Sequence, residues 1–298
     1  MELGSINPWI IIAACIMQIA TIYLVSFQWY LLANRVSENV KYKSVFHLNM
    51  VGSLVEAVTP AAKAGGEAVK IVILKKSMDF SYAKALSLVS MQKIISVVPF
   101  LILCLSGIVW FLSTFTGDQR YSNMLLGSFF FLLLVSLVLV LALVLLNRFS
   151  VSAERFPFIA SLLDKIKLGI STIKIDLMGV LQNKGQLTFH LFLSFGIWIF
   201  FAVKAYFIAY AMGLPITLLQ IGIITYLTYM VAMVPLLPGG LGTFEAAMVL
   251  LLALLGIPLY QAITFALVFR FTTFWFVFIW SGIYLLYYNM TNKARENN

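Results

Sequence analysis

Hydrophobic residues run along most of this chain in long stretches, separated by short polar segments. Five stretches are long enough to cross a bilayer as helices, at 8–32, 82–115, 121–147, 186–211 and 258–289. A helical crossing needs roughly 20 apolar residues, whereas a barrel strand shows about ten residues of alternating pattern. The pattern therefore predicts an all-α, polytopic integral membrane protein with about five full spans.

Two further apolar regions are broken by helix-disfavouring residues. The first, 45–76, is interrupted at Thr59-Pro60 and again at Gly65-Gly66, and the second, 216–255, at Pro235 and at residues 238–240. Each arm is about 10 to 15 residues long, which is short for a full crossing. We expect each region to form a re-entrant helical hairpin.

Composition agrees with this pattern. The chain is 62% hydrophobic and 10% charged, and its mean hydropathy is +1.00, whereas a soluble domain carries roughly a quarter charged residues. We expect a single membrane domain over residues 1–298 and no cleavable signal peptide, since the run 8–32 lacks a basic leader. The polar segment 148–185 has an Ile/Leu pattern that predicts a cytoplasmic surface helix lying against lipid headgroups.

The basic residues predict the orientation of the chain. If the loop 33–44 is inside, 14 of the 20 Lys and Arg residues fall on the inner side and only Arg120 falls outside. Basic loops mark the cytoplasmic face, so we expect a cell-membrane protein with its N-terminus outside and its C-terminus inside. The formal charge of +9 is thus explained by topology, and no nucleic-acid partner is expected.

The two broken regions carry the same sequence pattern. In each, a Glu follows a Pro by seven residues, and a basic residue lies in the next span: Glu67 precedes Lys93 by 26 residues, and Glu245 precedes Arg270 by 25. The predicted topology makes the first hairpin open inside and the second outside. The units 45–115 and 216–289 therefore form an expected inverted repeat, a plan common in alternating-access transporters.

The second break predicts a site for an anion. Pro238 is expected to end the first arm, and three glycines allow a tight turn and a close approach of another group. Thr243 is a candidate cap for the next arm, whose N-terminus would present free N–H groups to a phosphate. The turn glycines are Gly239, Gly240 and Gly242.

Charged residues within the apolar regions are the other candidates, because such groups are costly in lipid. Lys93 and Arg270 lie 12 residues into their spans, about 18 Å deep at 1.5 Å per residue. Glu67 and Glu245 could stabilise helix dipoles, serve as counter-ions to these bases, or carry protons. With Lys63 at the first hairpin tip and the N–H groups near Gly65 and Gly66, these residues predict a polar, net-positive cavity.

Several further residues have two interpretations from sequence alone. Glu56 could face the same cavity, and Lys70 could belong to the cavity or to the inner interface. Tyr226 and Tyr229 could line the cavity or only pack, and Lys204 is expected to extend outward to the interface. Cys15, Cys104, His47 and His190 lack metal or redox spacing, and no phosphate-binding loop or nucleophile motif occurs. We therefore expect no cofactor or metal, and a transporter rather than an enzyme.

The stretch 235–245, with Gly256 and Arg270 beyond it, resembles the membrane region of the lysyl-phosphatidylglycerol synthase/flippase family, and residues 59–67 look like that family's first signature. The resemblance covers nearly the whole chain. Members with a soluble aminoacyl-transferase domain make and flip aminoacylated phosphatidylglycerol, and we expect this chain to lack that domain. Stand-alone members look like flippases for phospholipids, glycolipids or polyprenyl-linked sugars.

Residues and resemblance together predict a flippase that moves an anionic or modified lipid headgroup through a midplane cavity. Membrane lipids are the expected partners, together with a second copy of the chain or a separate lipid-synthesising enzyme. Two alternatives stay open: an intramembrane lipid-modifying transferase, such as a phosphatidylglycerol lysyltransferase, and a membrane scaffold. A scaffold would tolerate neutralisation of the buried charges.

Overall fold

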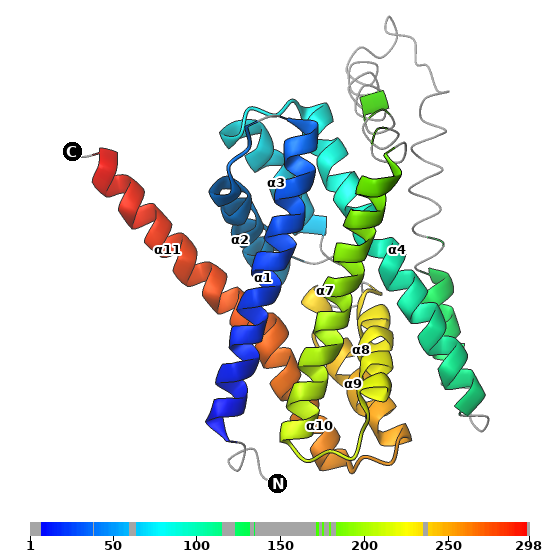
Figure 1. Cartoon of the computed structure of the whole chain (residues 1–298). Coiled ribbons are helices and arrows are strands. Elements are labelled where there is room, and N and C mark those ends of the chain that lie inside the picture. Colours follow the sequence, from blue (N-terminus) through cyan, green and yellow to red (C-terminus); the bar gives the residue numbers. More distant parts are fainter. Residues whose placement is uncertain are drawn as a thin grey trace, which may run out of the picture.

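The chain forms a bundle of long and short helices (Figure 1). The computed structural model describes residues 7–37, 39–59, 64–114, 123–131, 183–234 and 238–296, with single positions at 134, 171, 172, 175 and 179. All regular structure in these ranges is helical. The expected span 121–147, the segment 148–185 and Lys63 lie largely or wholly outside the described residues.

Four helices within the described ranges are long and apolar enough to cross a membrane. They are α1 (Pro8–Val36), α4 (Tyr82–Thr114), α7 (Lys184–Ala211) and a continuous helix made of α10 (Leu259–Arg270), a π-helical turn (Phe271–Trp275) and α11 (Phe276–Glu296). These elements match four of the five expected spans. The predicted fold class, an all-α polytopic membrane protein, is confirmed.

Two pairs of short helices occupy the broken regions. The first pair is α2 (Tyr42–Val58, 17 residues) and α3 (Ala64–Ser77, 14 residues), and the second is α8 (Leu218–Ala232, 15 residues) and α9 (Thr243–Leu254, 12 residues). In Figure 1, α2 and α3 lie in the upper half of the molecule and α8 and α9 in the lower half. The hairpins therefore enter the bundle from opposite ends.

The first hairpin breaks at one place and not at two. Residues 65 and 66 are helical and lie in the first turn of α3, so the expected second break at Gly65-Gly66 is wrong. A side chain on Gly66 would meet the Gly52 carbonyl at 2.7 Å, and one on Gly65 would collide with Thr59. These glycines let α3 pack closely against α2, and a helix tolerates them near its N-terminus.

The second break also differs in detail. Helix α8 ends at Ala232, so the first arm stops before Pro238, which was expected to end it. A 3₁₀ turn follows at Pro238–Gly240. Gly239, Gly240 and Gly242 have φ values of 60°, 67° and 77°, a region that residues with a Cβ rarely adopt. The expected need for glycine at this turn is confirmed.

The hydrophobic core has two parts. One cluster combines the end of α1, helices α2 and α3 and the start of α4, and includes Trp29, Leu48, Leu74 and Leu88. The other combines the second half of α4 with α7, α8, α9 and α10, and includes Phe100, Leu227 and Phe265. Each hairpin thus packs in its own cluster, and α4 belongs to both.

Candidate functional site

A cavity of about 470 Å³ lies where the two clusters meet. Its walls come from α1, α2, α3, α4, α7, α8, the π-helical turn and α11. Trp29 from the first cluster and Phe100 from the second both line it. Residues separated by up to 260 positions in sequence therefore share one wall.

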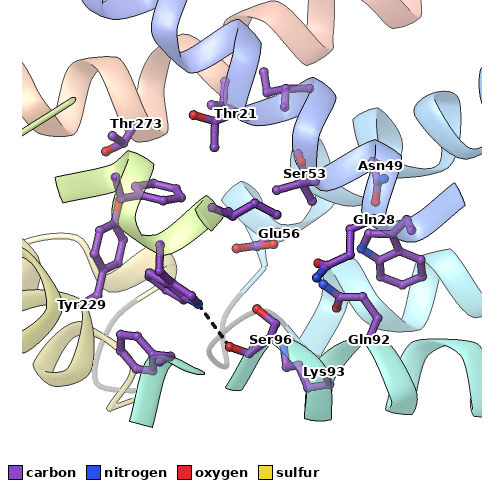
Figure 2. A pocket seen from close by; sticks show the side chains of 18 of the residues that line it. Thr21, Gln28, Asn49, Ser53, Glu56, Gln92, Lys93, Ser96, Tyr229 and Thr273 are labelled. Atoms are coloured by element: carbon purple, nitrogen blue, oxygen red, sulfur yellow. Dashed lines mark hydrogen bonds between the residues drawn. The ribbon is translucent and has the colours of Figure 1, made fainter. Parts of the chain in front are cut away.

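The lining is unusually polar for the interior of an apolar bundle. Its polar residues, several of which are labelled in Figure 2, are Gln18, Thr21, Gln28, Asn49, Ser53, Glu56, Glu67, Lys70, Gln92, Lys93, Ser96, Ser194, Tyr229 and Thr273. Polar and ionisable side chains inside a membrane-spanning bundle are costly and mark substrate or ion pathways.

The charged groups on the wall come from the first hairpin and the helix after it. Glu67 Oε1 lies 3.6 Å from Lys93 Nζ and 3.6 Å from Lys70 Nζ. The Lys70 ammonium also lies 4.4 Å from the Trp29 ring centroid, and Lys70 is buried. Lys70 is therefore a cavity residue. With Glu56, the described lining has two carboxylates and two ammonium groups, so its formal charges balance.

The equivalent charges of the second hairpin form a different arrangement. Arg270 Nε lies 3.2 Å from Glu245 Oε1, and Arg270 also donates to the Gly239 carbonyl. Its guanidinium carbon lies 4.7 Å and 4.2 Å from the ring centroids of Phe244 and Phe274. Arg270 itself does not line the cavity, whereas Phe274 does. Arg270, on α10, therefore contacts both the Pro-Gly turn, through the Gly239 carbonyl, and α9, through Glu245.

Each Glu–base pair thus joins the second helix of a hairpin to the helix that follows it, but the two pairs differ in exposure. The side chains of Lys93 and Glu67 are 43% and 18% exposed, and those of Arg270 and Glu245 are 6% and 22% exposed. Sequence spacing paired Glu67 with Lys93 and Glu245 with Arg270, and the structure brings both pairs into contact. Only the first pair is open to the cavity.

The N-terminus of α9 differs from the expectation for an anion site. Glu245 Oε2 accepts from the Gly242 amide at 2.7 Å, so the helix caps itself. Thr243 is the first residue of α9 and its hydroxyl donates to the Gly240 carbonyl at 3.0 Å. The expectation that Thr243 caps this helix is wrong, because Gly242 occupies the cap position.

The two candidate tyrosines separate in the structure. Tyr229 lines the cavity. Tyr226 is buried in the second cluster, and its hydroxyl donates to the Trp198 carbonyl at 3.3 Å. Of the other candidates, Glu56 lines the cavity, whereas Gly65, Gly66, Gly239, Gly240 and Gly242 shape the hairpins around it.

Uncharged polar residues of the spans were missed by the sequence prediction. On α1, Gln18, Thr21 and Gln28 lie three and seven residues apart and line the cavity. On α4, Gln92 and Ser96 do so at a spacing of four. These spacings place each set on one helix face. Polar residues at helical spacing inside an apolar span were therefore the signal that could have found them.

These polar groups also join the helices. Gln28 Nε2 donates to Ser194 Oγ at 2.5 Å, linking α1 to α7. Trp198 Nε1 donates to the Ser96 carbonyl at 3.1 Å, as the dashed line in Figure 2 shows, and its ring stacks on Phe100 with centroids 4.4 Å apart. Ser96 lies in the turn before Pro99, whose missing N–H weakens the helical hydrogen bonding.

Lys204 on α7 does not extend to an interface as expected. It is fully buried and donates to Gln18 Oε1 and, at 3.0 Å, to Thr21 Oγ1. Its ammonium also lies 4.5 Å from the Phe201 ring centroid. Polar and aromatic partners on α1 and α7 replace the water that outward extension would have supplied.

Within the described ranges, no group of three His, Cys, Asp or Glu residues could hold a metal ion.

Comparisons with known proteins agree with this architecture. The chain is 27% identical to a UPF0104 membrane protein of Pyrococcus horikoshii, over 93% of this chain and 86% of that protein. It is 25% identical to a UPF0104 membrane protein of Methanothermobacter thermautotrophicus (92% and 84% covered) and 23% identical to one of Methanocaldococcus jannaschii (85% and 76% covered). No solved structure gives a significant match. The family described as the lysylphosphatidylglycerol synthase TM region matches residues 2–281, and the chain belongs to that family.

Proposed function

We propose that this protein is a lipid translocase that moves a polar headgroup across the membrane through the cavity between its two hairpins. The observation that carries the proposal is the cavity itself. In the described part of the chain, four charged side chains and many amides and hydroxyls line about 470 Å³ of space within an apolar helical bundle. Such a lining could replace the water around a headgroup during its passage, while the lipid tails stay in the bilayer.

The hairpins supply the second argument. Helices that stop within the bundle, entering from opposite ends, are the elements with which alternating-access transporters build a central site. Here the Glu67–Lys93 pair joins the first hairpin to α4, and the Glu245–Arg270 pair joins the second hairpin to α10. Under this proposal the first pair contacts the headgroup and the second holds the turn that closes the opposite side.

The charges favour a headgroup with both polar and ionic character. Glu56, Glu67, Lys70 and Lys93 balance formally, and Gln28, Asn49 and Gln92, which lie on one side of the pocket in Figure 2, add amide groups to the wall. Such a wall suits a zwitterionic or hydroxylated headgroup as well as a simple anion. Phospholipids, aminoacyl-phospholipids, glycolipids and polyprenyl-linked sugars all remain within this proposal.

Reconstitution tests it. Proteoliposomes containing the full chain and fluorescent phosphatidylglycerol, phosphatidylethanolamine or a glycolipid are treated with a membrane-impermeant quencher, and the initial rate of label movement is measured. We expect wild type to move at least one of these lipids. Lys93→Met and Glu67→Gln should slow that movement about tenfold, because each removes one charge-assisted contact of about 1.5 kcal/mol.

A matched variant controls for charge alone. Lys76→Met removes an exposed lysine at the end of α3 that is not part of the cavity wall, and should move lipid at the wild-type rate. If wild type moves none of the lipids above the rate of empty vesicles, the translocase proposal fails. Unchanged rates in both cavity variants would overturn the role given to Glu67 and Lys93 in that movement.

A further inference from the structure

Lys204 is a buried cation that the proposed function does not yet use. Its side chain is fully buried, and within the described ranges no carboxylate pairs with it. Burial of an ammonium group without a counter-ion is costly. Its bonds to Gln18 and Thr21 and its contact with the Phe201 ring offset only part of that cost. An ionisable residue in such a place is a functional candidate by default.

The three groups that hold Lys204 all line the cavity. Gln18, Thr21 and Phe201 belong to its wall, whereas Lys204 does not. The ammonium therefore lies behind the side chains of Gln18, Thr21 and Phe201, which separate its charge from the cavity. At low effective dielectric such a charge is weakly screened.

Hydrogen-bond polarity shows what this wall offers to a ligand. An ammonium group only donates, so Gln18 must direct its Oε1 toward Lys204. Its Nε2 has no partner within the described part of the chain, so its N–H groups remain available. The Thr21 hydroxyl accepts from Lys204 and donates to the Met17 carbonyl at 3.1 Å. Gln18 thus presents an N–H donor to the cavity, and the positive charge of Lys204 lies next to its side chain.

The position of this charge matters because the four charged side chains of the described lining balance one another. Glu56, Glu67, Lys70 and Lys93 contribute no net formal charge. In Figure 2, Thr21 lies on the opposite side of the pocket from Lys93, with Glu56 between them. Within the described ranges, the unbalanced positive charge therefore lies at the Gln18–Thr21 side and not beside Lys93.

We propose that Gln18, Thr21 and Lys204 form a phosphate subsite of the cavity. A phosphate oxygen would accept from Gln18 Nε2, its negative charge would be balanced by Lys204, and the rest of the headgroup would extend toward Glu56 and Lys93. Phosphate chemistry is shared by free phosphate and by a lipid phosphodiester. The lipid assignment rests on the proposed function.

Binding to the purified full chain in detergent tests the subsite without requiring transport. The probes are dihexanoyl phosphatidylglycerol, inorganic phosphate and dihexanoylglycerol, which lacks phosphate, and affinity is measured by titration calorimetry. We expect Lys204→Met to weaken binding of the phospholipid about tenfold, as expected for loss of one charged partner. Binding of dihexanoylglycerol should not change, and Lys204→Arg should restore most of the phospholipid affinity.

A second variant addresses the chance that Lys204→Met alters folding. Gln18→Glu is nearly isosteric, keeps an acceptor for Lys204 and neutralises its charge by direct pairing. It should therefore fold at least as stably as wild type and still weaken phospholipid binding about tenfold. Lys75→Met, at the exposed end of α3, is the matched control and should bind as wild type does.

The outcomes separate the two proposals. Equal phospholipid affinity in wild type, Lys204→Met and Gln18→Glu overturns the subsite, even if lipid transport is observed. Lys204-dependent binding of the phospholipid without any lipid movement supports the subsite and overturns the translocase. Lys204-dependent binding of inorganic phosphate alone supports the subsite and overturns its assignment to a lipid.

Discussion

Two pairs of oppositely charged residues follow the same sequence rule and reach different environments. Glu67 and Lys93 face the cavity, whereas Arg270 is enclosed by Phe244, Phe274, Gly239 and Glu245. An exposed ion pair contributes little to stability, because water screens it and its side chains lose entropy. A buried one is costly to break, because the remaining partner keeps an unpaired charge. The two bases should therefore respond differently to the same substitution.

Replacing each base by methionine tests this difference. We expect Arg270→Met to lower the free energy of unfolding by about 3 kcal/mol, since it leaves Glu245 and the Gly239 carbonyl without their partner. Lys93→Met should change it by less than about 1 kcal/mol. Thermal or denaturant unfolding in detergent measures both values. Equal losses for the two variants would contradict the assignment of Arg270 to holding the turn.

At the scale of the elements, close packing of short helices explains the first hairpin. Gly66 faces the Gly52 carbonyl across the α2–α3 contact, where no Cβ fits. Small residues at such contacts let helix backbones approach in a membrane, where van der Waals packing replaces the hydrophobic effect as the driving force. Gly65 and Gly66, from which a helix break was predicted, therefore form the surface of α3 that packs against α2.

Gly66→Ala should push α2 and α3 apart and destabilise the protein by about 1–3 kcal/mol, as overpacking does. Gly196→Ala on α7 is the matched control, because its added methyl group meets nothing within 4 Å. Helix propensity should make that variant neutral or up to about 1 kcal/mol more stable. Unfolding in detergent reports both, and a neutral Gly66→Ala would refute the close-packing explanation.

At the scale of the whole molecule, the hairpins α2–α3 and α8–α9 lie at opposite ends of the bundle (Figure 1). The first and last helices follow the same arrangement, since α1 begins at the end that carries α8–α9 in this view and α11 ends toward the other. Combined with the distribution of basic residues, this arrangement predicts that α2–α3 opens to the cytoplasm and α8–α9 to the outside.

Single cysteines test that orientation in intact cells. In a background with Cys15 and Cys104 replaced by alanine, Lys75→Cys at the end of α3 and Pro215→Cys in the loop before α8 are both exposed. A membrane-impermeant maleimide added outside should label Pro215→Cys and not Lys75→Cys, and permeabilised cells should label both. Labelling of Lys75→Cys in intact cells would reverse the predicted orientation.

The amino-acid sequence by itself determined the features that depend on local pattern. Hydrophobic runs of sufficient length specified the helices, because the bilayer core excludes unpaired backbone groups. The break between α2 and α3 was predicted from proline, and the break between α8 and α9 from proline and glycine. Spacings of 26 and 25 residues also paired Glu67 with Lys93 and Glu245 with Arg270.

Only the tertiary structure decided which of these residues share the cavity. Burial depends on neighbours from distant elements: the rings of Phe244 and Phe274 enclose Arg270, whose side chain is 6% exposed, whereas that of Lys93 is 43% exposed. In the same way, Gln18 and Thr21 on α1 turn Lys204 inward instead of toward an interface. Polar residues at helical spacing mark a face of one helix in sequence, but which faces meet depends on contacts between residues about 185 positions apart. Only the packed helices therefore show which polar faces form the cavity wall.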